Sequence, residues 1–365
     1  MRHRSDLRLA QVLPSAAAAM GLAGFRDDLG VGLSHSVVVC LVDGLGATSI
    51  EDNADLFDSL RDADGGSIEA AFPTTTPTGL ATLGTGLDPG EHGIVGASFW
   101  LPEDDRILSP LHWGRRPTPE AVQPEPTVFE RVAGMGGCSF TIAPQAYVRS
   151  GLTSAALRGS DYLMADTALE RAAALREVCS FGQPALAYVY WAALDRAAHE
   201  FGTTSSQWRE AAKDVNELLW LLRAELPTDA SMIVTADHGM VDCEERIWIE
   251  DHARLTVGVR ALAGEPRMRH VYTHTEHEAA DVAQRWRDVL LENAIVMLRE
   301  EAIEAGLFGA VDPGIVERIG DVLAIAQGNT ILASRRFDER VSLLRGHHGA
   351  RTDAERRIPG LIVRQ

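Results

Sequence analysis

Residues 36–44 read SVVVCLVDG, an unbroken apolar run that ends in Asp43-Gly44. Because β-branched residues dominate and no polar residue alternates with them, the run predicts a strand buried on both faces, as in a parallel sheet. Residues 185–190 (ALAYVY) and 231–236 (SMIVTA) have the same character. Since helical patterns separate the three runs, the sequence predicts an α/β fold with a mainly parallel sheet sandwiched by helices.

The rest of the chain divides by pattern. The clearest helical patterns are residues 7–22, interrupted at Pro14, 161–178 and 205–225, whereas residues 101–126 read as a long loop that borders the site. Residues 251–334 mix short strands and helices, and the runs DVLAIAQ and TILAS, joined by Gly328-Asn329, predict a hairpin. We therefore expect a catalytic α/β core at 1–250, a small inserted α+β cap at 251–334 and a return to the core at 335–365.

Composition excludes several function classes. The net charge of −18 argues against a protein that coats nucleic acid, because like charges repel the phosphate backbone. Lys213 is the only lysine, which leaves Schiff-base chemistry and a Walker-type loop almost without candidates. No apolar run reaches membrane-spanning length and the N-terminus is a poor signal peptide, so we expect a cytoplasmic protein without a membrane segment. The scattered cysteines, which predict free thiols, are Cys40, Cys138, Cys179 and Cys243.

Residues 72–86, FPTTTPTGLATLGTG, place a threonine cluster before a proline and a small-residue helical pattern. Thr76 directly precedes Pro77, so we predict Thr76 as the N-cap of a helix and Pro77 as its first residue. A hydroxyl there lies at the positive end of the helix dipole, which suits a nucleophile or a phosphate oxygen. For this stretch alone, a purely structural cap is the alternative.

Aspartates and histidines follow the predicted strands at or soon after their ends. Because ligands bind beyond the carboxyl ends of strands in open α/β sheets, we expect these side chains to converge. Two of them stand four residues apart in LDRAAHEFG, which places both on one helix face. Their mixed oxygen and nitrogen donors suit zinc or a similar divalent ion. The candidates are Asp43, Asp195, His199, Asp237, His238 and one of His347 and His348.

Each candidate has a structural alternative. Asp43-Gly44 alone would be a turn, Asp195 and His199 alone a surface pair, and His-His-Gly alone a loop. Asp237-His238-Gly239 is harder to explain in this way, because a buried strand leads directly into it. Histidines outside the set are assigned structural roles (His35, His92) or are lesser candidates for contact with substrate or metal (His270, His274, His277).

The motifs DG, FPTTTPTGLATLGTGL with GEHGIVG, DRAAHEFG, ADHGM and HHG follow one another from Val37 to Gly349. In this order they resemble the alkaline phosphatase superfamily, and within it most closely the nucleotide pyrophosphatase/phosphodiesterases. The resemblance implies an alkaline phosphatase-like core that holds two divalent metal ions, with Zn²⁺ the expected ion. It also implies a phosphoric ester hydrolase that acts through a phospho-threonine intermediate.

Carried over residue by residue, the resemblance implies that Asp195, His199 and His348 hold one ion. It assigns the other ion to Asp43, Asp237, His238 and the Thr76 hydroxyl, with Thr76 as the nucleophile. Thr76 is preferred to Thr74 and Thr75 because it stands nine residues before Thr85, and His348 is preferred to His347 by its position before glycine.

One position departs from the family pattern. The phosphodiesterase branch commonly has an asparagine three residues after the nucleophile, which binds a phosphate oxygen, whereas this chain has Gly79. A backbone amide at Gly79 or the Thr78 hydroxyl is then the candidate phosphate contact. No phosphate-binding arginine and no third metal site are evident, which favours diesters over monoesters.

The expected substrate is a small phosphate ester, and a nucleotide is one candidate. On the same scaffold, a phosphomonoesterase, a phosphonoacetate hydrolase and a phosphomutase are alternatives, and a catalytically lapsed metal-binding protein is the alternative from another class. Phe99, Trp100 and Trp191 are candidates for stacking on a base, with packing in the core or at the rim as the alternative.

Overall fold

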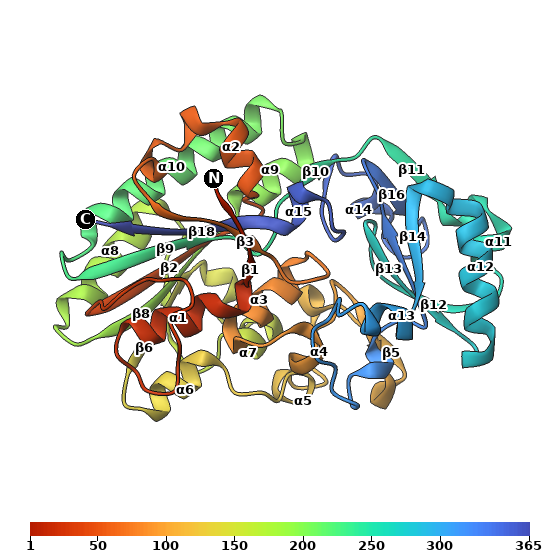
Figure 1. The fold of residues 1–365 in the computed structure, drawn as a ribbon, viewed down its shortest axis with the longest axis horizontal. Helices are drawn as coiled ribbons and strands as arrows, with labels where there is room; N and C mark the ends of the chain where they lie inside the picture. Colours follow the sequence, from red (N-terminus) through yellow and green to blue (C-terminus); the bar gives the residue numbers. More distant parts are fainter.

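A computed structural model describes residues 1–365, in which a large core carries a smaller cap at one end (Figure 1). The core sheet has eight strands, and its five neighbouring strands β9, β2, β8, β6 and β7 run parallel. The prediction of a mainly parallel α/β sheet is confirmed. Across the sheet, the strands are β1 (His3–Arg8), β3 (Asp64–Glu69), β18 (Arg357–Arg364), β9 (Ala230–Thr235), β2 (Ser36–Val42), β8 (Ala185–Trp191), β6 (Cys138–Ala143) and β7 (Asp161–Met164).

Helices cover both faces of this sheet. Every residue of β2 is buried, as its unbroken apolar sequence predicts, and one hydrophobic core of 77 residues joins the sheet to the helices. Above the sheet in Figure 1 lie α2 (Ala47–Asp52) and α10 (Ser206–Glu225), and α8 (Ala168–Ser180) packs against α10. Below it lie α1 (Val12–Ala19), α3 (Thr76–Thr85), α6 (Val128–Gly134) and α7 (Gly151–Ala156).

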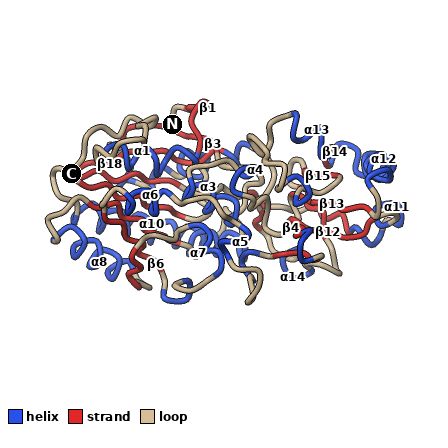
Figure 2. The backbone as a smooth tube through the Cα atoms, turned by 90° about the horizontal axis from the view of Figure 1, so that it is seen from below, coloured by secondary structure: helices blue, strands red, loops and turns tan.

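The cap has its own antiparallel sheet and its own hydrophobic core of 15 residues. It forms the opposite end of the elongated molecule from the core sheet, as Figure 2 shows. Its sheet runs in the order β12 (Val259–Glu265), β13 (Met268–Thr273), β15 (Val322–Ala326) and β14 (Ala294–Leu298). Around it lie α11 (Ala253–Thr256), α12 (Ala279–Leu290), α13 (Arg299–Glu304) and the parallel pair β11 (Glu245–Trp248) and β16 (Thr330–Ala333).

Short elements complete the core and border the strand ends. The predicted loop at 101–126 and its flanks carry β4 (Phe99–Leu101), β5 (Arg106–Leu108) and α5 (Pro119–Val122). No helix is long and apolar enough to span a bilayer, and the four cysteines are free as predicted. The other short elements of the core are α4 (Pro89–His92), α9 (Ala193–Phe201), β10 (Val241–Asp242), α14 (Glu339–Ser342), β17 (Gly346–His347) and α15 (Asp353–Arg356).

Three predicted elements differ from the structure. The helix expected at 7–22 spans only Val12–Ala19, because strand β1 extends to Arg8 and Leu9–Gln11 form a 3-10 turn. The helix expected at 161–178 begins at Ala168, because residues 161–164 form strand β7 at the sheet edge. The expected hairpin is wrong: β15 is flanked on both sides by β13 and β14, so β16 pairs with β11 instead.

Candidate metal centre

The carboxyl ends of the parallel strands bring the predicted Asp and His residues together. Two groups form, and within each the potential ligand atoms lie within 4.8 Å of one another. One group combines α9, which follows β8, with the segment after β17, whereas the other combines the ends of β2 and β9. The groups are Asp195, His199 and His348, and Asp43, Asp237 and His238.

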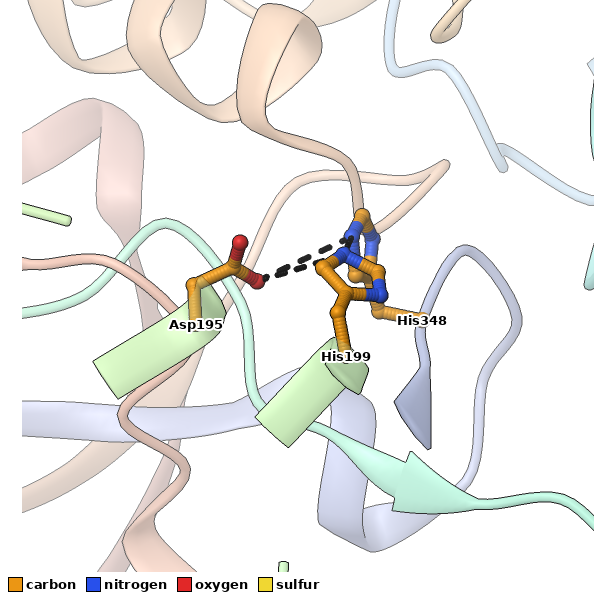
Figure 3. Close-up of side chains that lie close together, drawn as sticks. All are labelled: Asp195, His199 and His348. Atoms are coloured by element: carbon orange, nitrogen blue, oxygen red, sulfur yellow. Dashed lines mark hydrogen bonds and ion pairs between the residues drawn. The ribbon is translucent and has the colours of Figure 1, made fainter. Parts of the chain in front are cut away.

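The first group converges on one point between α9 and the chain after β17 (Figure 3). Asp195 Oδ1 lies 3.5 Å from His199 Nε2 and 4.0 Å from His348 Nε2. The two imidazole nitrogens are 3.1 Å apart. Because Asp195 and His199 are four residues apart on one helix, a single turn presents both, as the spacing predicts.

The second group lies beside the first, and the predicted nucleophile Thr76 lies next to it. His238 Nε2 lies 3.5 Å from both Asp43 Oδ1 and Asp237 Oδ2. The Thr76 hydroxyl is 3.2 Å from the same nitrogen. The rings of His238 and His348 stack with centroids 3.7 Å apart, so the two groups are in direct contact.

Backbone carbonyls fix the tautomer of all three histidines. Nδ1 of His199 donates to Gly346 O at 2.8 Å, that of His238 to Gly239 O at 3.1 Å, and that of His348 to Thr74 O at 2.9 Å. Since a carbonyl oxygen can only accept, each Nδ1 carries the proton and each Nε2 of a neutral ring presents a lone pair. Backbone bonds of this kind orient metal-binding histidines in many proteins.

Three carboxylate oxygens confirm that the residues fit metal ions. Asp43 Oδ1, Asp195 Oδ1 and Asp237 Oδ2 are buried and have no hydrogen-bond donor, and these are the oxygens that face the histidine nitrogens. Buried, unpaired acceptors are costly, and one divalent cation in each group would satisfy all three of them.

Burial also shapes the protonation of the centre. Burial, followed by the charges of Asp237 and Asp195, raises the pKa of Asp43 well above its usual range, and burial raises the pKa of Asp237. Burial lowers the pKa of His348 well below its usual range, and so favours the neutral form that binds metals. A bound cation would favour the charged carboxylates again.

The helix N-cap is Thr75, so the prediction of Thr76 as N-cap is wrong. Thr75 has extended backbone angles and its side chain accepts from the Thr78 amide, whereas Thr76 and Pro77 are the first two residues of α3. The Thr75 hydroxyl is therefore already engaged in a hydrogen bond with the first turn of the helix. The Thr76 hydroxyl, one position further, faces the second group and is available for chemistry.

Neither predicted phosphate contact beyond Thr76 is supported. The Thr78 side chain is buried and accepts a hydrogen bond from the Thr75 hydroxyl at 3.2 Å. The Gly79 amide donates to Thr75 O at 2.8 Å. A Cβ at Gly79 would lie 2.6 Å from Asp237 Cβ, so glycine permits α3 to approach the end of β9. This close approach leaves no room for the asparagine common in the family.

A cavity of about 630 Å³ opens directly onto the two groups. Its lining includes Thr76 and Asp43, and also Pro110 and Leu111 from the segment predicted to border the site. Phe99, Trp100 and Trp191 are not among its lining residues. Trp100 instead packs against Arg260, and Trp191 against Arg171.

Three further residues at the centre were missed in the sequence. Arg196 lines the cavity one position after Asp195, and it is the missing candidate for an arginine that contacts phosphate. The Tyr190 hydroxyl donates to Asp43 Oδ2. Glu265, at the end of cap strand β12, lies 3.5 Å from His348 Nδ1. Of the three, only Tyr190 could have been noticed in the sequence, because it lies near the end of the apolar strand that leads to Asp195.

The remaining histidines lie apart from the two groups. His347 Nε2 donates to Leu344 O at 3.2 Å, so the choice of His348 over its neighbour agrees with the geometry. His92 and His270 are buried and bonded to the Thr82 hydroxyl and to Val95 O, respectively. The other histidines considered in the sequence, His35, His274 and His277, are exposed.

Solved structures share this architecture over most of the chain. Murine ectonucleotide pyrophosphatase/phosphodiesterase 5 is 20% identical with a TM-score of 0.73, and the match covers 90% of this chain and 87% of that one. Phosphonoacetate hydrolase from Sinorhizobium meliloti 1021 is 17% identical with a TM-score of 0.69, and 90% of each chain is covered. The fold is therefore alkaline phosphatase-like. A model of the type I phosphodiesterase / nucleotide pyrophosphatase family matches residues 37–351, and the chain belongs to this family.

Proposed function

We propose that this hydrolase cleaves phosphodiesters with two divalent metal ions and Thr76 as its nucleophile. The observation that carries the proposal is the position of the Thr76 hydroxyl, which is free of the helix cap and 3.2 Å from His238 Nε2. Asp195, His199 and His348 would hold one ion, and Asp43, Asp237 and His238, with the Thr76 oxygen, would hold the other. Their mixed donors favour Zn²⁺.

Bound divalent ions would act as Lewis acids toward phosphate oxygens and lower the pKa of a coordinated hydroxyl. Thr76 Oγ1 attacks phosphorus and releases its proton to solvent, the bond from phosphorus to the leaving oxygen breaks, that oxygen takes up a proton from solvent, and a phospho-threonine forms. Water then attacks the same phosphorus and loses a proton, the bond from phosphorus to Oγ1 breaks, and Oγ1 regains a proton. The positive end of the α3 dipole lies at Thr76, where the negative charge would develop, although the amides of Thr78 and Gly79 are already bonded to Thr75.

The chain positions these groups through fixed contacts. Tyr190 holds Asp43 through its hydroxyl, and Thr74 O holds the His348 ring. Arg196, which lines the cavity, would be the residue that contacts a non-bridging phosphate oxygen. Each contact reduces the reorganisation that the reaction would otherwise require.

The related structures support this proposal. One murine structure is described as an inactive variant with a single threonine-to-alanine substitution, in complex with AMP. The Sinorhizobium hydrolase was solved with phosphonoformate and with phosphonoacetate, which are small anions. The cavity of this chain, with 11 hydrophobic residues among its 21 lining residues, favours an ester with an organic group over such anions.

Thr76→Ala and Thr76→Ser test the nucleophile on zinc-loaded protein. We expect Thr76→Ala to lose more than 95% of bis-p-nitrophenyl phosphate turnover (on the order of the 10² or more ascribed to covalent catalysis) while it retains about two zinc per chain. Thr76→Ser should retain part of the activity. A Thr76→Ala protein that keeps more than a few per cent would exclude the assignment, and preference for p-nitrophenyl phosphate would exclude the diesterase.

A further inference from the structure

We propose that the cavity beside the metal centre binds an apolar alkyl or aryl group of the diester rather than a nucleobase. The inference depends on the proposed function for the reaction, whereas the binding of the apolar group can be measured without turnover. It concerns the part of the cavity that extends from Thr76 between the sheet and helices α3 and α7.

The walls of this part are apolar and aromatic. Leu80 comes from α3, Leu152 from α7, and Ala143 from the end of β6. Tyrosines from β8 form the opposite wall: the rings of Tyr188 and Tyr190 stack with centroids 6.4 Å apart. An organic group attached to a phosphate at Thr76 would therefore leave water and contact apolar side chains on several sides.

The tyrosine hydroxyls offer a ligand few hydrogen-bond partners. Tyr188 is 1% exposed and its hydroxyl is fully buried, so a group in the cavity would contact its ring and not its hydroxyl. The hydroxyls of Tyr190 and Tyr162 are already used, because Tyr190 donates to Asp43 and Tyr162 donates to Pro144 O. Among the lining tyrosines, only the half-buried Tyr147 has a hydroxyl free for a ligand.

The remaining hydroxyls of the lining are already used. Thr141 Oγ1 pairs with Ser160 Oγ at 2.7 Å, and Ser150 Oγ donates to Thr153 Oγ1 at 2.8 Å. A nucleobase carries several donors and acceptors, most of which would be buried there without partners. At the mouth, Leu111 is 58% exposed, which further favours an apolar group.

The first experiment measures hydrolysis of p-nitrophenyl phosphodiesters whose second group is methyl, butyl, octyl or 5′-thymidyl. We expect kcat/KM to rise about threefold for each CH₂ that enters the cavity, so that the butyl ester exceeds the methyl ester roughly 30-fold. The thymidyl ester should be slower than the butyl ester. A rate that does not depend on chain length, or a thymidyl ester faster than the butyl ester, would overturn the inference.

The second experiment measures binding without turnover, by calorimetry on zinc-loaded Thr76→Ala protein. Octylphosphonate should bind more tightly than butylphosphonate, and both more tightly than AMP. Equal affinities for octylphosphonate and butylphosphonate, or tighter binding of AMP than of either, would overturn the inference.

A variant that fills the cavity, compared with a matched substitution outside it, tests where the alkyl chain binds. Ala143→Leu narrows it and should remove the difference between octyl and butyl, whereas Ala133→Leu, on the exposed side of α6, should retain that difference. If Ala143→Leu does not fold, Thr153→Phe, also in the lining, replaces it. A difference that persists in the filled variant would place the alkyl chain elsewhere and overturn the inference.

The two experiments separate the reaction from the pocket. If alkylphosphonates bind with increasing affinity but no diester is cleaved, the proposed reaction fails and the pocket stands. If diesters are cleaved by Thr76 without any dependence on chain length, and calorimetry shows none, the reaction stands and the pocket assignment fails.

Discussion

Two adjacent histidines, His347 in β17 and His348 directly after it, point in different directions. His348 Nε2 faces His199 Nε2 at 3.1 Å, whereas His347 Nε2 donates to a backbone carbonyl. The pair therefore provides an internal test of the metal centre, because the same substitution can be made at a candidate ligand and at its neighbour.

We expect His348→Ala to weaken zinc binding more than 100-fold, because loss of a residue that only supports a ligand already costs about 10–100-fold. His347→Ala should change zinc affinity by less than tenfold, although it removes a buried ring. Competition with a fluorescent chelator measures both affinities. Equal losses in the two variants would contradict the assignment of His348.

Buried histidines outside the centre predict a loss of stability in acid. His92 Nδ1 accepts the Ile94 amide at 3.2 Å, and His270 Nδ1 accepts the Gly320 amide at 3.0 Å, so protonation would break both bonds. Burial lowers the pKa of His92 to about 3 and that of His270 to about 4. Unfolded histidine titrates near 6.5, so below about pH 6.5 the unfolded state binds more protons and stability falls until the folded pKa is reached.

At pH 5, each of these histidines should therefore cost about 2 kcal/mol of the free energy of unfolding relative to pH 7. His92→Gln keeps a donor and an acceptor without titrating, and should reduce the loss between pH 7 and pH 5 by about that amount. Urea denaturation in EDTA, which removes the pH dependence of metal binding, measures it. The same pH dependence in both proteins would refute the role of His92.

At the level of elements, the start of α3 depends on its contact with the end of β9. A Cβ at Gly79 would meet Asp237 Cβ at 2.6 Å and Asp237 Cα at 3.1 Å, whereas a Cβ at Gly134, in α6, would meet nothing within 4 Å. Gly79→Ala therefore forces the helix and the metal centre apart.

Gly79→Ala should lower the free energy of unfolding by about 1–3 kcal/mol and reduce diester hydrolysis, because overpacking displaces Asp237. Gly134→Ala, the matched control in a helix, should be neutral or stabilise the protein by up to about 1 kcal/mol. Thermal unfolding measures the stability of the two variants, and initial rates of diester hydrolysis measure their activity. If Gly79→Ala behaves like Gly134→Ala, the close approach is not required.

The sequence predicted the elements that its local pattern determines. Strands β2, β8 and β9 agree with their apolar runs because all of them are buried inside one sheet. The hairpin failed because pairing of β15 depends on β13 and β14, which are distant in sequence. The N-cap was misplaced by one residue because three successive threonines offer the same capping chemistry, and only the backbone angles distinguish them.

The six Asp and His candidates were found because they follow strands or share one helix face, but other parts of the site depend on tertiary contacts. Glu265 reaches His348 from the cap, and Arg196 is exposed beside its predicted neighbour. No local pattern distinguishes either residue from an ordinary surface charge. Gly79 was noticed as a missing asparagine, and only the distance to Asp237 explains it.

At the level of the whole molecule, a buried ion pair joins the cap to the core. Arg267 lies between β12 and β13 and donates to both oxygens of Glu355, in α15, at 3.0 and 2.8 Å. Both side chains are fully buried, and Glu355 also accepts the Ala350 amide at 2.9 Å, two residues after His348. The pair therefore connects the position of the cap to the segment that carries a candidate ligand.

Arg267→Met should cost about 3–5 kcal/mol of the free energy of unfolding, because it leaves the Glu355 carboxylate buried and unpaired. Arg254→Met breaks an exposed pair with Asp288 and should cost less than about 1 kcal/mol. Urea denaturation measures both, and the double variant Arg267→Met/Glu355→Gln should recover part of the loss. Equal costs for the two arginines would show that the buried pair does not join the two parts of the molecule.

The place of β18 in the sheet has a consequence for biosynthesis. Residues 357–364 lie between β3 and β9, and antiparallel pairing with both joins the β1–β3 edge to the parallel strands. Until residue 364 has been translated, β3 and β9 each present an unpaired edge, and such edges invite pairing with other chains. A nascent chain would therefore be exposed to aggregation throughout its elongation, and the assembled sheet would form only after translation has passed this strand.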